Sequence, residues 1–138
     1  MAHRLDRCQT GAMRQDVLVA DWVVVMRFAV PTDSANAFED EASGVARLLT
    51  GFDGCTGVDV ARASDDRELW VVVARWDSVG SYRKALSSFE VKLNAVPFLS
   101  RAIDEPTAFE VLFGSDAAGE RAASSDLAGD AGTTERSR

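Results

Sequence analysis

Two segments of the chain place apolar side chains on both faces of an extended backbone, which is typical of covered β-strands. They are WVVVMRFAV at residues 22–30 and ELWVVVARWD at residues 68–77. Successive side chains of a strand point to opposite faces, so each segment has two largely apolar faces. In the second segment one face carries Trp70, Val72, Ala74 and Trp76, and the other carries Leu69, Val71, Val73 and Arg75. Both segments are therefore predicted to be strands that are covered on both sides.

Between these strands the apolar period changes to that of a helix. Over about residues 32–50 the apolar positions recur every three or four residues, at Ala35, Phe38, Ala42, Val45 and Leu49. Thr32 or Asp33 could cap the first turn, and Gly51 follows the last one. The pattern predicts an amphipathic helix whose apolar stripe lies on a sheet.

The rest of the chain supplies two more strands and further helical segments. Residues 55–63 alternate as a strand, and the polar run SDDR at residues 64–67 predicts a tight turn into the next one. Residues 79–86 and 89–99 have helical spacing, the second interrupted by Pro97. The last strand is predicted in TAFEVLF, residues 107–113.

This order of elements, βαββαβ, predicts an α+β domain with the ferredoxin-like, split βαβ arrangement. In that fold the helices cover one face of an antiparallel sheet with the spatial order fourth, first, third, second strand. Strands one and three would still expose Val23, Val25, Val71 and Val73 on the face without helices. We expect a second copy of the sheet to cover that face, which gives a homodimer in the form of a dimeric α+β barrel.

The same face is predicted to carry four charges, at Arg27, Arg75, Asp59 and Glu110. With the strand order above, Arg27 would lie between Glu110 and Arg75, and Arg75 next to Asp59, so that opposite charges meet across strands. These residues either pair inside the interface, where they would fix its register, or lie at its wet rim.

Outside residues 20–113 the composition is that of tails. Residues 1–19 lack a sustained period, and residues 114–138 are mostly small and polar, so we expect a flexible N-terminal tail and a disordered C-terminal tail around one domain. Either Met1 or Met13 could be the first residue.

Charge and residue types exclude several function classes. The formal charge is -7, with 15 Lys and Arg among 22 Asp and Glu, which argues against a nucleic-acid partner. No apolar run is long enough to span a membrane or to serve as a signal peptide, so we expect a cytoplasmic protein. Cys8 and Cys55 are expected to be free thiols, and the single histidine, His3, lies in a tail. The sequence therefore offers neither a metal-ligand cluster nor a catalytic triad.

At the level of whole segments, residues 20–113 resemble the antibiotic biosynthesis monooxygenase family, a group of dimeric α+β barrels. The likeness runs through WVVVMRFAV, SDDRELWVVVARWDS and VPFLSRAIDEPTAFEVL. The group includes cofactor-independent oxygenases that turn polycyclic phenols into quinones, haem-degrading enzymes and members without a known activity. The resemblance implies no cofactor here, and with His3 in a tail the haem-degrading branch is excluded.

In the quinone-forming members a Trp ends the third strand and a Tyr follows six residues later, and Trp76 and Tyr82 match both positions. The family's strand Asn is Val72 here, and its second-strand His falls at about Arg62. The resemblance implies a cleft for a small aromatic molecule, in which Trp76 stacks on the ring while Arg62 and Tyr82 hold an oxyanion. Its walls would be Trp70, Val72, Met26 and Phe28.

Two functions follow from these residues. The first is a monooxygenase that acts on an electron-rich aromatic or polyketide-like substrate with molecular oxygen. The second is a non-catalytic barrel for ligand binding or assembly, in which the tryptophans only fill the core, Tyr82 only packs, and Arg62 is a solvated charge. The Trp76 and Tyr82 pair favours the first, and the changes at Val72 and Arg62 favour the second.

Overall fold

The computed structural model describes residues 21–123. The chain divides into two compact units, one formed by Trp22–Phe109 and the other by the residues on either side of it. The predicted tail at residues 1–19, with His3 and Cys8, lies outside the described residues, and so do residues 124–138 of the predicted C-terminal tail. No described helix is long and apolar enough to cross a membrane.

A four-stranded sheet forms the centre of the fold, and it has the predicted order. Its strands are β1 (Trp22–Ala29), β2 (Cys55–Arg62), β3 (Leu69–Trp76) and β4 (Ala108–Glu110), arranged as β2-β3-β1-β4. β3 pairs antiparallel with both β1 and β2. The prediction of an α+β fold with the split βαβ order is therefore confirmed. The last strand is shorter than predicted, because regular pairing covers only three residues.

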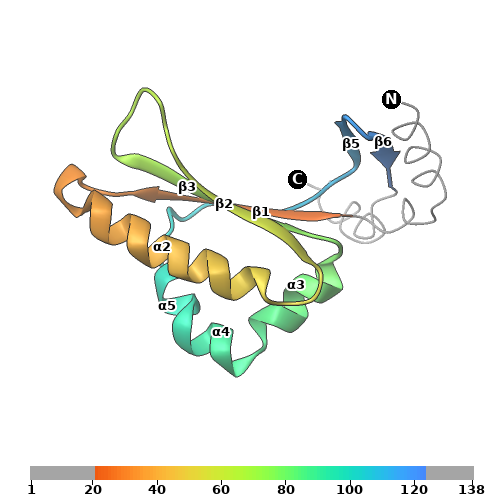
Figure 1. Cartoon of the computed structure of the whole chain (residues 1–138), viewed down its shortest axis with the longest axis horizontal. Coiled ribbons are helices and arrows are strands. Elements are labelled where there is room, and N and C mark those ends of the chain that lie inside the picture. Colours follow the sequence, from red (N-terminus) through yellow and green to blue (C-terminus); the bar gives the residue numbers. More distant parts are fainter. Residues whose placement is uncertain (1–20, 124–138) are drawn as a thin grey trace, which may run out of the picture. The chain divides into compact units, whose positions relative to one another are not determined.

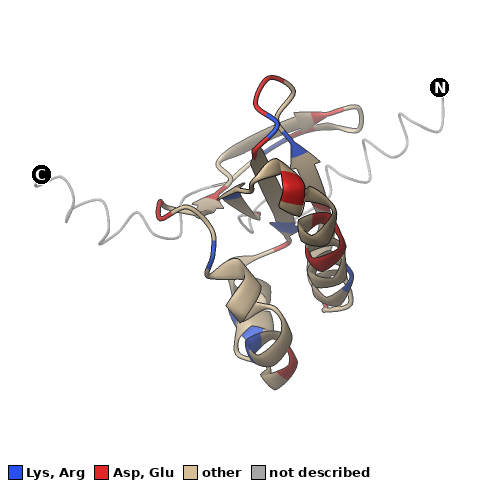
Figure 2. Ribbon diagram, turned by 90° about the vertical axis from the view of Figure 1, so that its left-hand side faces the viewer, with Lys and Arg blue, Asp and Glu red and all other residues tan. Residues whose placement is uncertain are grey.

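The helices of the larger unit lie on one side of this sheet (Figure 1). They are η2 (Thr32–Ser34), α2 (Ala35–Thr50), α3 (Val79–Leu86), α4 (Phe89–Asn94) and α5 (Val96–Leu99). The predicted first helix begins with a 3-10 turn, so Ser34 rather than Thr32 or Asp33 precedes α2, and Gly51 follows it as predicted. On α2, Glu39, Asp40 and Glu41 are all exposed, and acidic positions are red along the ribbon of this helix in Figure 2.

Alternate residues of the central strands form the core under the helices. On β1 and β3 every second side chain is buried, and α2 adds Phe38, Ala42, Val45 and Leu49. Burial of these apolar surfaces is the main force that holds helices and sheet together, at about 25 cal/mol for each Å² removed from water. Val23, Val25, Val71 and Val73 alternate with the buried set and keep part of their surface accessible.

The charges predicted on this second face are only partly paired as expected. Arg75 contacts Asp59, with Nη1 2.9 Å from Oδ2, as predicted. Arg27 lies opposite Val71 in the register, so it is not beside Arg75. Arg27 also has a charged partner that the sequence did not predict, Glu105, with Nε 3.6 Å from Oε2.

The contact between Arg27 and Glu105 follows from the path of the chain before β4. The Ile103 amide donates a hydrogen bond of 2.7 Å to the Arg27 carbonyl, and the Val25 amide donates one of 2.7 Å to Thr107. The loop itself therefore runs alongside β1, and it brings Glu105 next to Arg27 before the last strand begins.

In the smaller unit, part of the predicted disordered tail forms a hairpin. β5 (Phe113–Asp116) pairs antiparallel with β6 (Gly119–Ala122). The Asp116 carboxylate accepts a hydrogen bond from the Ala118 amide at 2.8 Å, and Gly119 adopts φ 136°. A short turn signal thus outweighs a composition that indicates disorder, because aspartate and glycine favour tight turns.

Candidate functional site

Three aromatic side chains meet where β1 begins and β3 ends. Trp22 lies directly opposite Trp76 in the strand register. Tyr82, from α3, contacts both rings, with centroid distances of 6.2 Å to Trp22 and 5.7 Å to Trp76. The structure thus brings Trp76 and Tyr82 together, and it adds Trp22. We call these three residues the Trp-Tyr cluster.

Trp22 was not predicted to be a site residue, although the sequence contains a signal for its position. A residue that opens one central strand and one that closes its antiparallel partner face each other whenever the register is flush. The eight residue pairs between β1 and β3 have such a register.

The cap of α3 holds Tyr82 over the sheet. The Ser78 hydroxyl accepts a hydrogen bond from the Ser81 amide at 3.1 Å, and the Tyr82 amide donates to the Ser78 carbonyl. Gly54 packs against this turn at φ 91°, where a side chain would overlap Ser81 and Asp77. The tyrosine therefore enters the helix one turn after a fixed start.

The cluster contains polar groups that lack acceptors. The indole Nε1 atoms of Trp22 and Trp76 are buried without a hydrogen-bond partner. Burial also raises the pKa of Tyr82, so its phenol keeps its proton and remains a hydrogen-bond donor at neutral pH. An unpaired buried donor costs about 1–3 kcal/mol, so an acceptor that reached these groups would be favoured.

Tyr82 is the most exposed member of the Trp-Tyr cluster. Trp76 is 2% exposed and Trp22 8%, whereas Tyr82 is of intermediate exposure.

Cys55 lies opposite Trp76 on β2. Burial raises the pKa of its thiol, and the Sγ–H group donates to the Gly57 carbonyl at 4.0 Å. Because the thiolate is the nucleophilic form, this cysteine is not set up as a nucleophile at neutral pH. Among the described residues no group of histidine, cysteine, aspartate and glutamate is arranged to hold a metal.

The predicted walls of the cleft belong to the closed core. Met26, Phe28, Trp70 and Val72 are each at most 6% exposed. Met26 pairs with Val72 in the middle of the sheet, and Phe28 pairs with Trp70 at the far end from the Trp-Tyr cluster. These four residues share one face and occupy the middle and the far end of the strand pair, away from the Trp-Tyr cluster.

Arg62 also lies at that far end. It is opposite Trp70 in the register, and its guanidinium carbon is 5.2 Å from the centroid of the Trp70 ring. Trp76 lies six positions after Trp70 on β3, which is about 20 Å at the usual rise of a strand. Within one chain, Arg62 and Tyr82 thus do not face the same ligand oxygen, contrary to the arrangement expected from the sequence.

Comparison with solved structures finds the same fold in several proteins. SnoaB, a cofactor-independent oxygenase from Streptomyces nogalater, is 20% identical with a TM-score of 0.55, over 67% of this chain and 94% of that one. A conserved protein from Methanosarcina mazei Go1 is 20% identical with a TM-score of 0.55, over 70% and 94%. Rv0793 from Mycobacterium tuberculosis is 18% identical with a TM-score of 0.55, over 70% and 98%.

Comparison with curated proteins finds no match. A family model described as antibiotic biosynthesis monooxygenase matches residues 22–93, which include β1, β2, β3, α2 and α3. Because this match spans more than half of the chain and contains the Trp-Tyr cluster, the protein belongs to the antibiotic biosynthesis monooxygenase family.

Proposed function

We propose that the protein oxidises an electron-rich aromatic substrate with molecular oxygen, without a metal or flavin, at the Trp-Tyr cluster. The observation that carries this proposal is the contact of Tyr82 with two buried indoles whose N–H groups have no acceptor. Such donors suit an anionic oxygen on a flat ring, because a buried donor gains most from a charged acceptor.

The chemistry requires the substrate to supply its own electrons. A phenolate or enolate of an anthrone-like ring gives electrons to oxygen far more readily than the neutral form does. In the overall reaction one oxygen atom replaces two hydrogens on the ring carbon to give the quinone, and the other leaves with those hydrogens as water. Donors around the anion favour its formation, and the closed aromatic wall keeps solvent from the intermediate.

We also propose that the protein forms a homodimer through the sheet face without helices. The partly accessible valines of β1 and β3 support this, together with Phe109, which is 46% exposed. Val73→Arg is expected to give a monomer by analytical ultracentrifugation, while Glu39→Arg on the outer surface of α2 leaves the dimer intact. A Val73→Arg variant that remained dimeric would exclude this face as the interface.

A second candidate function is ligand binding without catalysis. It is favoured by the position of Arg62, which lies at the other end of the sheet from Tyr82, and by Val72 in place of the family's asparagine. In the described strand register Arg62 is opposite Trp70, so it does not lie beside the cluster.

The test is oxygen uptake by the purified protein with a panel of anthrones and naphthols, with and without a chelator. Uptake should survive the chelator, and Tyr82→Phe should lower kcat/KM by about a hundredfold, as for the loss of one oxyanion donor. Trp76→Phe should also lower it. Trp70→Phe is the matched control, because it removes an equally buried and unpartnered indole at the far end of β3.

Equal losses in Trp70→Phe and Trp76→Phe would refute the assignment to this cluster. Binding of a compound by calorimetry without any oxygen uptake would establish the second candidate instead.

A further inference from the structure

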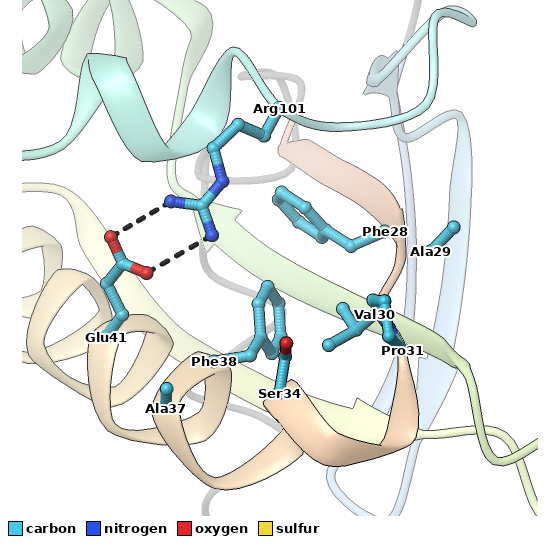
Figure 3. A pocket seen from close by; sticks show the side chains of 9 residues that line it. All are labelled: Phe28, Ala29, Val30, Pro31, Ser34, Ala37, Phe38, Glu41 and Arg101. Atoms are coloured by element: carbon cyan, nitrogen blue, oxygen red, sulfur yellow. Dashed lines mark hydrogen bonds and ion pairs between the residues drawn. The ribbon is translucent and has the colours of Figure 1, made fainter.

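A cavity of about 370 Å³ opens at the end of the domain opposite the Trp-Tyr cluster (Figure 3). It lies where β1 ends and α2 begins, and Arg101 borders it from the segment after α5. Its volume is within the range of small-molecule sites. The lining residues are Phe28, Ala29, Val30, Pro31, Ser34, Ala37, Phe38, Glu41 and Arg101.

Aromatic rings form the inner wall of this cavity. Phe28 and Phe38 are 2% and 3% exposed, and their ring centroids lie 5.2 Å apart. Behind them Phe98 is 5.0 Å from Phe28 and 5.3 Å from Phe38. A flat aromatic ring can pack against such a surface in an offset or edge-to-face geometry.

An ion pair lies at the rim. Arg101 donates two hydrogen bonds to the Glu41 carboxylate, at 3.0 and 3.2 Å, in the fork geometry visible in Figure 3. Both side chains are about half exposed. An exposed pair of this kind contributes about 0–1 kcal/mol, so a second carboxylate can replace Glu41 at little cost.

The surroundings favour exchange of Glu41 rather than of Arg101. The Arg101 guanidinium carbon lies 5.1 Å from the centroid of the Phe98 ring, a contact that holds the cation at the rim. Glu41 also borders a second hollow of about 350 Å³ beside Asn94, which gives its side chain room to turn away. In addition, the Ser34 hydroxyl makes no capping hydrogen bond to α2.

We propose that this cavity binds a small aromatic carboxylate. The ring packs on Phe28 and Phe38, and the carboxylate takes the place of Glu41 on Arg101, with the Ser34 hydroxyl as a further donor. The site is separate from the Trp-Tyr cluster, because Phe28 pairs with Trp70, six residues along β3 from Trp76.

Calorimetry with 2-naphthoate tests the proposal, with neutral 2-naphthalenemethanol and cationic 2-naphthylmethylammonium as controls of the same shape. The naphthoate should bind most tightly. Arg101→Gln and Glu41→Gln both remove the same ion pair, so any structural effect of its loss is shared by the two variants. Arg101→Gln should weaken naphthoate binding about tenfold, which corresponds to 1.4 kcal/mol, whereas Glu41→Gln should strengthen it.

A change of the same sign in both variants, or tighter binding of the ammonium compound, would overturn the proposal. So would the absence of saturable binding at millimolar naphthoate.

Ala37→Phe, at an exposed position of α2 on the cavity wall, should block binding while far-ultraviolet circular dichroism stays unchanged. If Arg101→Gln does not fold, Glu41→Gln alone tests the proposal, since it should strengthen naphthoate binding and weaker binding would overturn the proposal. Trp76→Phe should leave naphthoate affinity unchanged, which separates this site from the proposed oxygenase site.

Discussion

The two ends of the β1–β3 pair both carry aromatic residues with buried indole N–H groups that lack an acceptor, but they differ in what lies above these residues. At one end, Trp22 and Trp76 face each other under Tyr82, and their indole N–H groups have no acceptor. At the other end, Phe28 faces Trp70 below an open cavity whose rim charges are already paired. Strand register thus provides an aromatic pair at each end. The helix above each pair determines whether a side chain covers it or a cavity lies over it.

The helix starts explain this difference. Ser78 caps α3 with its side chain and holds Tyr82 down on the sheet, which closes the first end. α2 instead follows a 3-10 turn without a side-chain cap, and its first turns leave a hollow over Phe28.

The largest expected effect comes from truncating one ring at each end. Trp76→Ala and Phe28→Ala should each lower the free energy of unfolding by about 3–5 kcal/mol, because both residues are at most 2% exposed. Urea unfolding with an unchanged m-value measures this loss. If Phe28→Ala cost less than a kilocalorie per mole, the wall of the cavity would not be part of the core.

A smaller effect separates the two helix starts. Ser78→Ala removes a capping hydrogen bond and should lower the free energy of unfolding by about 1 kcal/mol, whereas Ser34→Ala removes none and should leave it nearly unchanged. The same urea titration checks both variants. Equal losses in the two variants would contradict the difference in capping.

The rim ion pair should contribute less still. A double-mutant cycle of Arg101→Gln and Glu41→Gln is expected to give a coupling energy of up to about 1 kcal/mol, which falls as salt is added. A coupling that did not respond to salt would indicate a pair shielded from solvent and harder to exchange for a ligand.

The smallest effect on stability comes from ionisation of Tyr82. It is absent at neutral pH and lowers stability only in alkali. Burial raises the pKa of Tyr82 above its ordinary value of 10.0, so the unfolded chain loses this proton first and stability falls as the pH rises above that value. Cys55, raised above 9.0, acts in the same direction. Tyr82→Phe should flatten the alkaline decline relative to the unchanged protein in thermal unfolding, and an unaltered decline would show that the phenol is solvated.

Much of the fold was predictable because it depends on local periods. The two-residue alternation of residues 22–30 and 68–77 and the helical spacing of residues 32–50 gave the elements and their order, and the six-residue step from Trp76 to Tyr82 gave one contact. These patterns persist because burial of one face overrides most other preferences.

The parts that the sequence did not predict depend on register and on loops. The family resemblance implied that Arg62 shares a cleft with Tyr82, but it fixed no position along the strand, and the register places Arg62 opposite Trp70. The partner of Arg27 followed the path of a loop, and the hairpin at residues 113–122 followed a single turn. Composition and two-residue alternation contain no information on the path of a loop or on an individual turn.

The buried indoles also allow both ends of the sheet to be followed by the intrinsic fluorescence of the domain. Tyr82 is the single tyrosine of the chain, and its ring centroid lies about 6 Å from those of two tryptophans (6.2 and 5.7 Å), so its excitation should pass to them and its own emission should be quenched in the folded state. Trp70, at the other end, contacts Phe38 on the cavity wall. Emission from Trp70 and from the Trp22 and Trp76 pair can thus be separated by single Trp→Phe changes, and each end of the sheet can be followed without an added label.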